Sequence, residues 1–209
     1  MKYDPKTHHR RSIRLQGYDY SQSGAYFVTI VAQGRASLFG HIENGEMVWN
    51  DAGEMLVKWW NELPSKFPQI TLGAFVVMPN HFHGIIIINA TVPETTMDEA
   101  VGGDLRVSPG SSDGQEGGHV GPPQPPPQRP NAPLSQMIQW FKTMTTNEYI
   151  RGVKKMGWPR FDGKLWQRDY YEHIIRNADE ANRIHLYIES NPSNWAEDEE
   201  NKQFRPLVL

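Results

Sequence analysis

Two histidines, His81 and His83, stand two residues apart inside the apolar, β-branched run 75–89. Alternate side chains of a β-strand share a face, so both imidazoles point the same way while Phe82 points into a core. Two imidazoles on one face suit two ligands of one metal ion. The pair fits equally well two buried histidines satisfied by backbone partners, and by itself it does not decide between these interpretations.

A second chemically capable pair, Tyr187 and Asn191, lies in a predicted helix. Asn177 and Glu180 form a capping-box pattern and Pro192 must end the helix, so the two side chains stack one turn apart on one face. The Asn191 amide oxygen could join two imidazoles around a divalent cation and leave positions open. The Tyr187 phenol, with an ordinary pKa near ~10, becomes a nucleophile once a cation or base activates it.

Basic residues interleaved with aromatic rings form a third feature, centred on residues 151–168. Cations attract phosphates and flat rings stack on unpaired bases, so the pattern favours a surface for single-stranded nucleic acid. A solvated loop with tryptophans in the core is the alternative, and the basic N-terminal arm 1–23 could equally be a solvated tail. The residues expected on the DNA surface are Arg10, Arg11, Arg14, Lys142, Arg151, Lys154, Lys155, Arg160, Lys164, Trp166 and Arg168.

Elements with strong local signals must position these groups. Alternating or β-branched sequence predicts strands, and the short join 78–80 makes the second and third of them antiparallel. Asn44-Gly45 predicts a hairpin. A capping box at Asp51 opens an amphipathic helix that Pro64 stops. The predicted strands are 24–33, 69–77 and 81–90, the hairpin is 41–49, and the helices are 51–63, 134–150 and 177–191.

Composition limits the class of protein. The 209 residues suffice for one domain with insertions, and the lack of cysteine excludes disulfides and thiolate metal sites. Segment 91–133, rich in Gly and Pro, should be a disordered insertion or a proline-stiffened spacer within one domain. Its Pro-rich part could instead dock in the aromatic groove of a partner. Its six acidic and two basic residues carry a net charge of −4, which leaves +1 on the remainder of a chain whose net charge is −3. With no secretory or membrane-spanning run, we expect a soluble cytoplasmic protein.

Three ordered motifs carry a family resemblance: residues 79–84 (PNHFHG), 165–177 (LWQRDYYEHIIRN) and 187–192 (YIESNP). Together they resemble the single-tyrosine HUH transposases, specifically the REP-associated tyrosine transposases (RAYTs), over most of the chain from 24 to 192. The resemblance implies an α+β, ferredoxin-like or RRM-like antiparallel sheet with helices packed on one face, the HUH endonuclease fold. That domain would span 24–192, interrupted by the insertion and followed by a C-terminal tail, 193–209.

The resemblance also implies an activity. His81, His83 and Asn191 would hold Mg²⁺ or Mn²⁺, and Tyr187 would attack single-stranded DNA to form a 5′-phosphotyrosine link, often at hairpins of repeated extragenic palindromes. Such a protein would be cytoplasmic and nucleoid-associated. The DNA target, and whether the protein is a monomer or a dimer, stay open.

Alternatives to this assignment follow from the same residues. Tyr170 or Tyr171 could be the nucleophile in place of Tyr187, and His173 and His185 could add polar groups, although isolated histidines are more often structural. A ferredoxin-like nucleic-acid-binding module without catalysis, or a metal-dependent phosphodiesterase that uses water, would share the fold and the basic surface.

Overall fold

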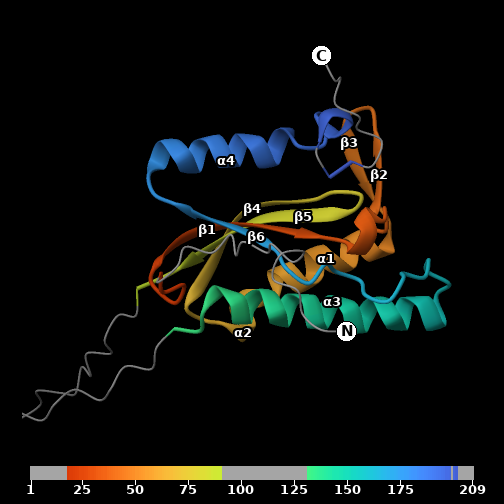
Figure 1. Cartoon of the computed structure of the whole chain (residues 1–209), viewed down its shortest axis with the longest axis horizontal. Helices are drawn as coiled ribbons and strands as arrows, with labels where there is room; N and C mark the ends of the chain where they lie inside the picture. The colour runs from red at the N-terminus through yellow and green to blue at the C-terminus, as the bar shows by residue number, and fades with distance from the viewer. Residues whose placement is uncertain (1–17, 91–130, 199, 202–209) are drawn as a thin grey trace, which may run out of the picture. The chain divides into compact units, whose positions relative to one another are not determined.

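A computed structural model describes residues 18–90, 131–198, 200 and 201. Its centre is a four-stranded antiparallel sheet with the strand order β4-β5-β1-β6 (Figure 1). The strands are β1 Gly24–Val31, β4 Ile70–Val77, β5 His81–Ile88 and β6 Tyr171–Ile175. Helix α1, Asp51–Asn61, lies between β1 and β4 in the chain, and α3, Leu134–Lys155, lies between β5 and β6. This β-α-β-β-α-β order is ferredoxin-like and confirms the expected α+β fold.

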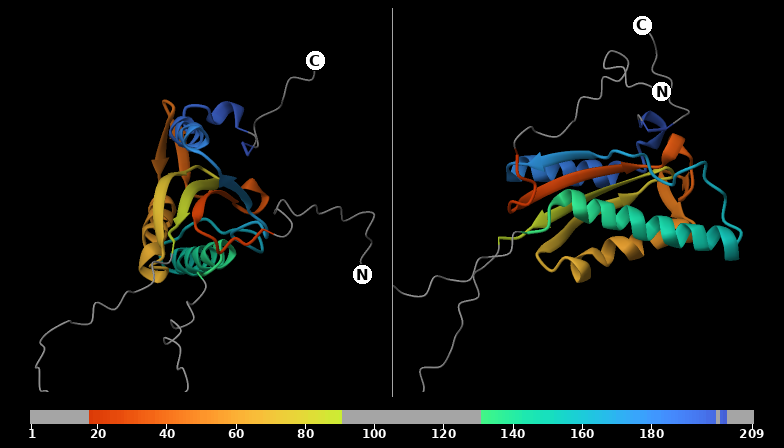
Figure 2. Two further views of the ribbon diagram at one scale, coloured as in Figure 1. Left: turned by 90° about the vertical axis from the view of Figure 1, so that its left-hand side faces the viewer. Right: turned by 60° about the horizontal axis from the view of Figure 1, so that its bottom comes forward.

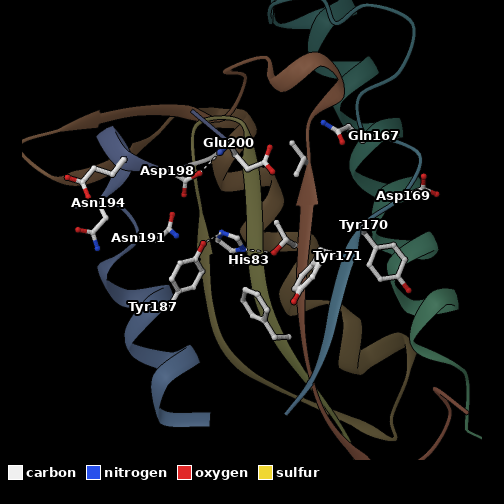
Figure 3. A pocket seen from close by; sticks show the side chains of 14 residues that line it. His83, Gln167, Asp169, Tyr170, Tyr171, Tyr187, Asn191, Asn194, Asp198 and Glu200 are labelled. Atoms are coloured by element: carbon white, nitrogen blue, oxygen red, sulfur yellow. Dashed lines mark hydrogen bonds between the residues drawn. The ribbon is translucent and has the colours of Figure 1, made fainter. Parts of the chain in front are cut away.

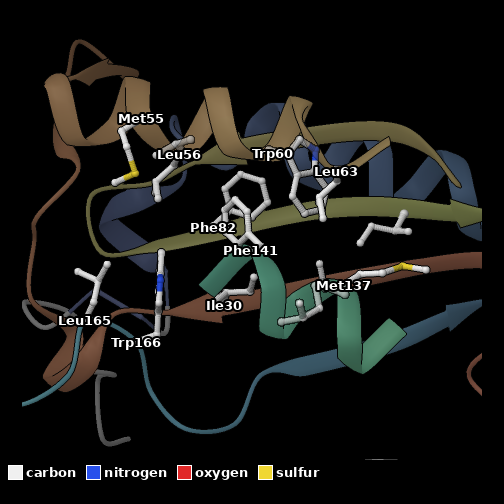
Figure 4. Packing of buried hydrophobic residues seen from close by; sticks show 14 of the residues in the cluster. Ile30, Met55, Leu56, Trp60, Leu63, Phe82, Met137, Phe141, Leu165 and Trp166 are labelled. Carbon is white, nitrogen blue, oxygen red and sulfur yellow. The ribbon is translucent and has the colours of Figure 1, made fainter. Parts of the chain in front are cut away.

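Helices α1 and α3 cover one face of the sheet (Figures 1 and 2). Aromatic rings fill the space between the layers: Trp60 of α1 lies 4.6 Å from Phe82 of β5, and Phe82 lies 5.4 Å from Phe141 of α3, between ring centroids (Figure 4). All three side chains are buried. Phe82 therefore points into the core, as the alternation of β5 predicts.

Helix α4, Ala178–Ser190, crosses the opposite face of the sheet (Figure 1). Its Ile184 and Ile188 pack against Phe27 of β1 and Ile85 of β5. The expectation of helices on one face thus holds for α1 and α3 but not for α4. The physical reason is that this second face also carries apolar side chains, which need a cover of their own.

Two predicted helix boundaries are wrong in detail. The N-cap of α1 is Asn50, not Asp51, because the Asn50 side chain accepts from the N–H groups of Ala52 and Gly53, both at 3.0 Å. At the other end α1 finishes at Asn61, and Pro64 lies in the first turn of the short helix α2, Leu63–Lys66, where its missing N–H costs nothing.

Helix α3 is longer than predicted and runs to Lys155. Its last turns carry three of the basic residues expected on the DNA-binding surface, Arg151, Lys154 and Lys155. Cations are favourable there because the helix dipole is negative at its C-terminus.

The predicted hairpin is confirmed as β2, Gly40–Glu43, and β3, Glu46–Trp49. Its turn residues Asn44 and Gly45 have φ of 52° and 80°, as a two-residue turn of this type requires. The edge strand β6 was not predicted. Two short 3₁₀ helices, η1 Gln33–Arg35 and η2 Trp195–Glu197, complete the described chain.

Several predictions concern residues that the structure leaves undescribed. Arg10, Arg11 and Arg14 of the N-terminal arm, and residues 91–130 of the insertion, lie outside the described ranges. The expectations for them stay predictions. Among the helices of the described ranges, none combines the length and the apolar character that crossing a membrane would require.

Candidate active site

The two histidines lie on the face of the sheet that α4 covers. In the antiparallel register of β1 and β5, Thr29 pairs with His83 and Val31 with His81. The intervening Phe82 belongs to the core on the other face. Both histidines are buried, with exposed fractions of 0% and 3%.

Asn80 fixes the protonation pattern of His81. The Asn80 Nδ2 group lies 2.7 Å from the Glu200 carbonyl and 3.3 Å from the Arg35 carbonyl, so it is the amide donor and Oδ1 is the acceptor. Oδ1 therefore accepts the His81 Nδ1 proton at 2.8 Å. The His81 Nε2 atom then carries a lone pair, which a metal ligand needs.

Thr29 holds His83 by the same ring atom, Nδ1. Its hydroxyl lies 2.8 Å from His83 Nδ1, which leaves Nε2 turned toward His81 Nε2 at 3.0 Å. Burial lowers the pKa of His81 to about 3. Burial, together with the neighbouring His81, lowers the pKa of His83 well below its usual range. Both rings are consequently neutral near pH 7.

The distant helix α4 brings its pair to the histidines. The Tyr187 hydroxyl lies 3.4 Å from His83 Nε2, and the two rings meet edge to face at 5.3 Å (Figure 3). Asn191, 3% exposed, directs its side chain into the same space, and its buried Oδ1 has no hydrogen-bond partner among the described residues. A buried acceptor of this kind is costly unless something binds it.

These side chains line an open cavity of about 840 Å³ (Figure 3). Phe27 forms part of its wall, with Tyr187 at 6.1 Å and Tyr171 at 6.4 Å, each edge to face between ring centroids. Tyr171 is 42% exposed and Tyr187 47%. Both side chains are therefore accessible to a substrate, and Tyr171 lies on the same face as Tyr187.

Tyr170 also lines the cavity but has a different setting. It packs against the main core, and the Lys142 ammonium lies 5.5 Å from its ring centroid. Lys142 also donates to the carbonyl groups of Gln167, Arg168 and Asp169 at 3.0 to 3.3 Å. Its cation thus fastens the chain that leads into β6, which is a structural use and not a free phosphate contact.

The residues present fit a divalent cation. A carboxylate joins the histidines: the nearest donor atoms of His81, His83 and Asp198 all lie within 4.8 Å of one another. The 3.0 Å separation of the two Nε2 atoms matches adjacent ligands of one ion, because bonds of about 2.1 Å at a right angle span about 3.0 Å. The orphaned Asn191 oxygen adds a neutral donor.

Sequence reasoning missed Asp198, Thr29 and Asn80. The acidic run 197–200 was visible as charge, but nothing in its spacing connected it with a strand more than a hundred residues earlier. Asn80 precedes the histidines directly and was interpreted only as a turn residue. Part of the predicted C-terminal tail therefore lies against the site.

The expected DNA-binding residues that the structure describes differ in their exposure. Trp166 is 4% exposed, its ring packs 5.1 Å from Phe39, and its Nε1 donates to Thr145 at 2.9 Å. It is a core residue, and its expected role in stacking on bases is wrong for this structure. The exposed members are Arg151, Lys154, Lys155, Arg160, Lys164 and Arg168.

The two histidines expected as possible polar contributors, His173 and His185, pair with acids on α4. His173 lies 2.8 Å from Glu180, and His185 lies 3.1 Å from Glu189. Glu180 also accepts from the Arg176 N–H at 2.8 Å, while Asn177 caps the helix by accepting from the Glu180 N–H. His173 therefore helps to hold the start of the helix that carries Tyr187.

Comparison with known proteins gives one relative along nearly the whole chain. An uncharacterized protein of Haemophilus influenzae (strain ATCC 51907 / DSM 11121 / KW20 / Rd) is 35% identical over 202 residues, which cover 95% of this chain and 96% of the relative. The chain belongs to the same family as this protein. The relative brings no activity with it, and no family model matches the chain.

Comparison with solved structures identifies a transposase with the same fold. A REP-associated tyrosine transposase bound to a REP hairpin superposes with a TM-score of 0.51, covering 89% of this chain and 76% of that one. Sequence identity is 16%, so the likeness concerns the fold. It agrees with the fold expected from the three motifs.

Proposed function

We propose that this protein is a metal-dependent transposase that cuts and rejoins single-stranded DNA through a 5′-phosphotyrosine on Tyr187. The observation that carries the proposal is the meeting of two distant segments: the Tyr187 hydroxyl of α4 lies 3.4 Å from Nε2 of His83 on β5. A fold shared with a tyrosine transposase supports it. A core histidine pair would have no need of an exposed phenol beside it.

The reaction exchanges one phosphodiester bond for another. Tyr187 Oη loses its proton and bonds to phosphorus, the P–O3′ bond breaks, and the departing oxygen takes up a proton as a 3′-hydroxyl. Attack by a 3′-hydroxyl on the phosphotyrosine reverses these steps and frees the phenol. Because the bond energy is conserved in the phosphotyrosine, rejoining needs no external energy source.

His81, His83 and Asn191 would hold Mg²⁺ or Mn²⁺, and Asn80 and Thr29 would orient the two rings by their Nδ1 atoms. When bound, the ion would polarise the scissile phosphate and favour the phenolate form of a neighbouring tyrosine. Imidazole and amide donors are neutral, so they leave the charge of the ion undiminished.

Hairpin DNA is the substrate we propose, since the transposase of the same fold was solved with a REP hairpin. The DNA phosphates would bind to exposed basic residues, which are Arg151, Lys154, Lys155, Arg160, Lys164 and Arg168. Such a substrate would associate the protein with the nucleoid.

The test is a covalent adduct between the protein and a labelled hairpin with a single-stranded flank, formed with Mn²⁺ and resolved under denaturing conditions. Tyr187→Phe should abolish the adduct. Tyr171→Phe is the matched control, because it removes the second accessible hydroxyl of the same cavity, and it should retain the adduct. Loss of the adduct in Tyr171→Phe with retention in Tyr187→Phe would move the nucleophile to β6.

Other outcomes separate the remaining candidates. Cleavage with metal but without an adduct would indicate a phosphodiesterase that uses water. Salt-sensitive binding with neither cleavage nor adduct, indifferent to His81→Ala and His83→Ala, would indicate a binding module without catalysis.

A further inference from the structure

A structured turn from the C-terminal part of the chain closes one side of the cavity. After η2, the Asn201 side chain donates back to the Trp195 carbonyl at 2.8 Å, and the Glu200 N–H donates to Asp198 Oδ1 at 2.7 Å. The Trp195 ring lies 6.0 Å from the His81 ring. These contacts hold Asp198 at a defined place, with a side chain only 8% exposed.

Asn80 joins this turn to the histidines. One amide group donates from Nδ2 to the Glu200 carbonyl and accepts at Oδ1 from His81 Nδ1. Arg35 adds an ion pair to the Glu200 carboxylate from the β1 side. These contacts fix the position of the turn relative to Asn80, the residue that holds the His81 ring.

We propose that Asp198 is an anionic ligand of the cation, which completes a set made of His81, His83 and Asn191. Asp198 Oδ2 lies 3.9 Å from His81 Nε2, while Oδ1 accepts from the backbone. This inference rests on the proposed metal site. A carboxylate oxygen is the donor that Mg²⁺ and Mn²⁺ favour, so Asp198 shifts the site toward these ions and away from softer metals.

The electrostatics of the cavity agree with this role. Asp169, Glu197, Asp198 and Glu200 all line it, and a DNA phosphate would be repelled by such a wall unless a cation intervened. One carboxylate is close enough to the histidines to share an ion with them. The ion would then link three separate parts of the chain: β5, α4 and the C-terminal turn.

The test measures Mn²⁺ binding to the full chain without DNA, by isothermal titration calorimetry. Asp198→Asn should weaken binding at least about tenfold, as the loss of a ligand or its support does. Glu197→Gln is the matched control: it removes the same charge from the same cavity, and it should bind within about twofold of wild type. Melting curves in EDTA establish that each variant is folded.

A second readout keeps the proposal testable if Asp198→Asn is destabilised. Hydrogen exchange of the amides in residues 195–198, 200 and 201 should slow on addition of Mn²⁺ in wild type and in Glu197→Gln, because the bound ion would restrain the turn. The proposal would be overturned if Mn²⁺ left hydrogen exchange in wild type unchanged, or if Asp198→Asn kept the wild-type affinity for Mn²⁺. In the latter case, loss of binding in His81→Ala would leave the proposed function standing. Conversely, Asp198-dependent binding in a protein that forms no DNA adduct would defeat the proposed function alone.

Discussion

Thr29→Val isolates the contribution of one hydrogen bond to the site. Valine has nearly the shape of threonine, so the change leaves no cavity but removes the hydroxyl that lies 2.8 Å from His83 Nδ1. Thr29 is 8% exposed and His83 3%, so water does not readily replace the lost partner. A buried polar group left without its partner costs about 1–3 kcal/mol. We expect that loss in the free energy of unfolding, measured by urea denaturation in EDTA.

The same change should weaken Mn²⁺ binding about 10- to 100-fold, because an imidazole whose Nδ1 partner is lost no longer has a fixed orientation. Thr29→Ser is the control: it keeps the hydroxyl and removes one methyl, at about 0.8 kcal/mol. Valine has a higher intrinsic strand propensity than serine, and this difference alone would make Thr29→Val the more stable of the two variants. We expect the opposite order of stability, because only valine lacks the hydroxyl. If Thr29→Val matched wild type in both stability and Mn²⁺ affinity, the hydroxyl would not orient His83 and the reasoning would fail.

Two further changes probe the packing behind the site. Gly84→Ala would place a Cβ 2.5 Å from Cζ2 of Trp60 and 2.9 Å from Cε1 of Phe82, both rings fully buried, so it should cost about 1–3 kcal/mol; an unchanged urea midpoint would contradict this. Burial lowers the pKa of Lys142 to about 8, against 10.5 for an ordinary lysine. Between these pH values Lys142 is protonated in the unfolded chain and neutral in the folded chain, so the free energy of unfolding rises with pH. Relative to Lys142→Met, wild type should therefore gain up to about 2 kcal/mol in urea unfolding between pH 8 and 9.5, and identical pH profiles would refute the shift.

The sequence predicted the elements whose signals are local. The alternation around Phe82 gave the direction of the histidines, Asn44-Gly45 gave the hairpin turn, and Asn177 gave the cap of α4. Each of these depends on residues within a few positions of one another, so a single sequence suffices. The cap of α1 was misplaced by one residue because Asn50 and Asp51 are both good capping residues. Only the fold shows that Asn50 accepts from the N–H groups of Ala52 and Gly53 and donates to the Leu38 carbonyl.

Features that depend on distant pairing were out of reach. Strand β6 is short and forms an edge, and its identity rests on pairing with β1, such as Tyr171 with Thr29. Trp166 stands among basic residues in the sequence, yet its indole N–H donates to Thr145 inside the core. Charge and aromatic content along a chain do not reveal which rings face inward. Asp198 was hidden for a related reason, since the fold of the C-terminal turn decides what it approaches.

The two faces of β1 and β5 pack against different helices, and this difference explains the position of the site. One face meets α1 and α3 through a large aromatic core, which fixes the sheet. The other meets α4 through a small cluster of Phe27, Ile85 and Ile188. Because this apolar contact is small, it leaves space beside it for polar groups, and the histidines and Tyr187 meet in that space. The sheet can thus hold both imidazoles rigidly while helix α4, which carries Tyr187, rests on few contacts, as the proposed entry of a DNA strand into the site would require.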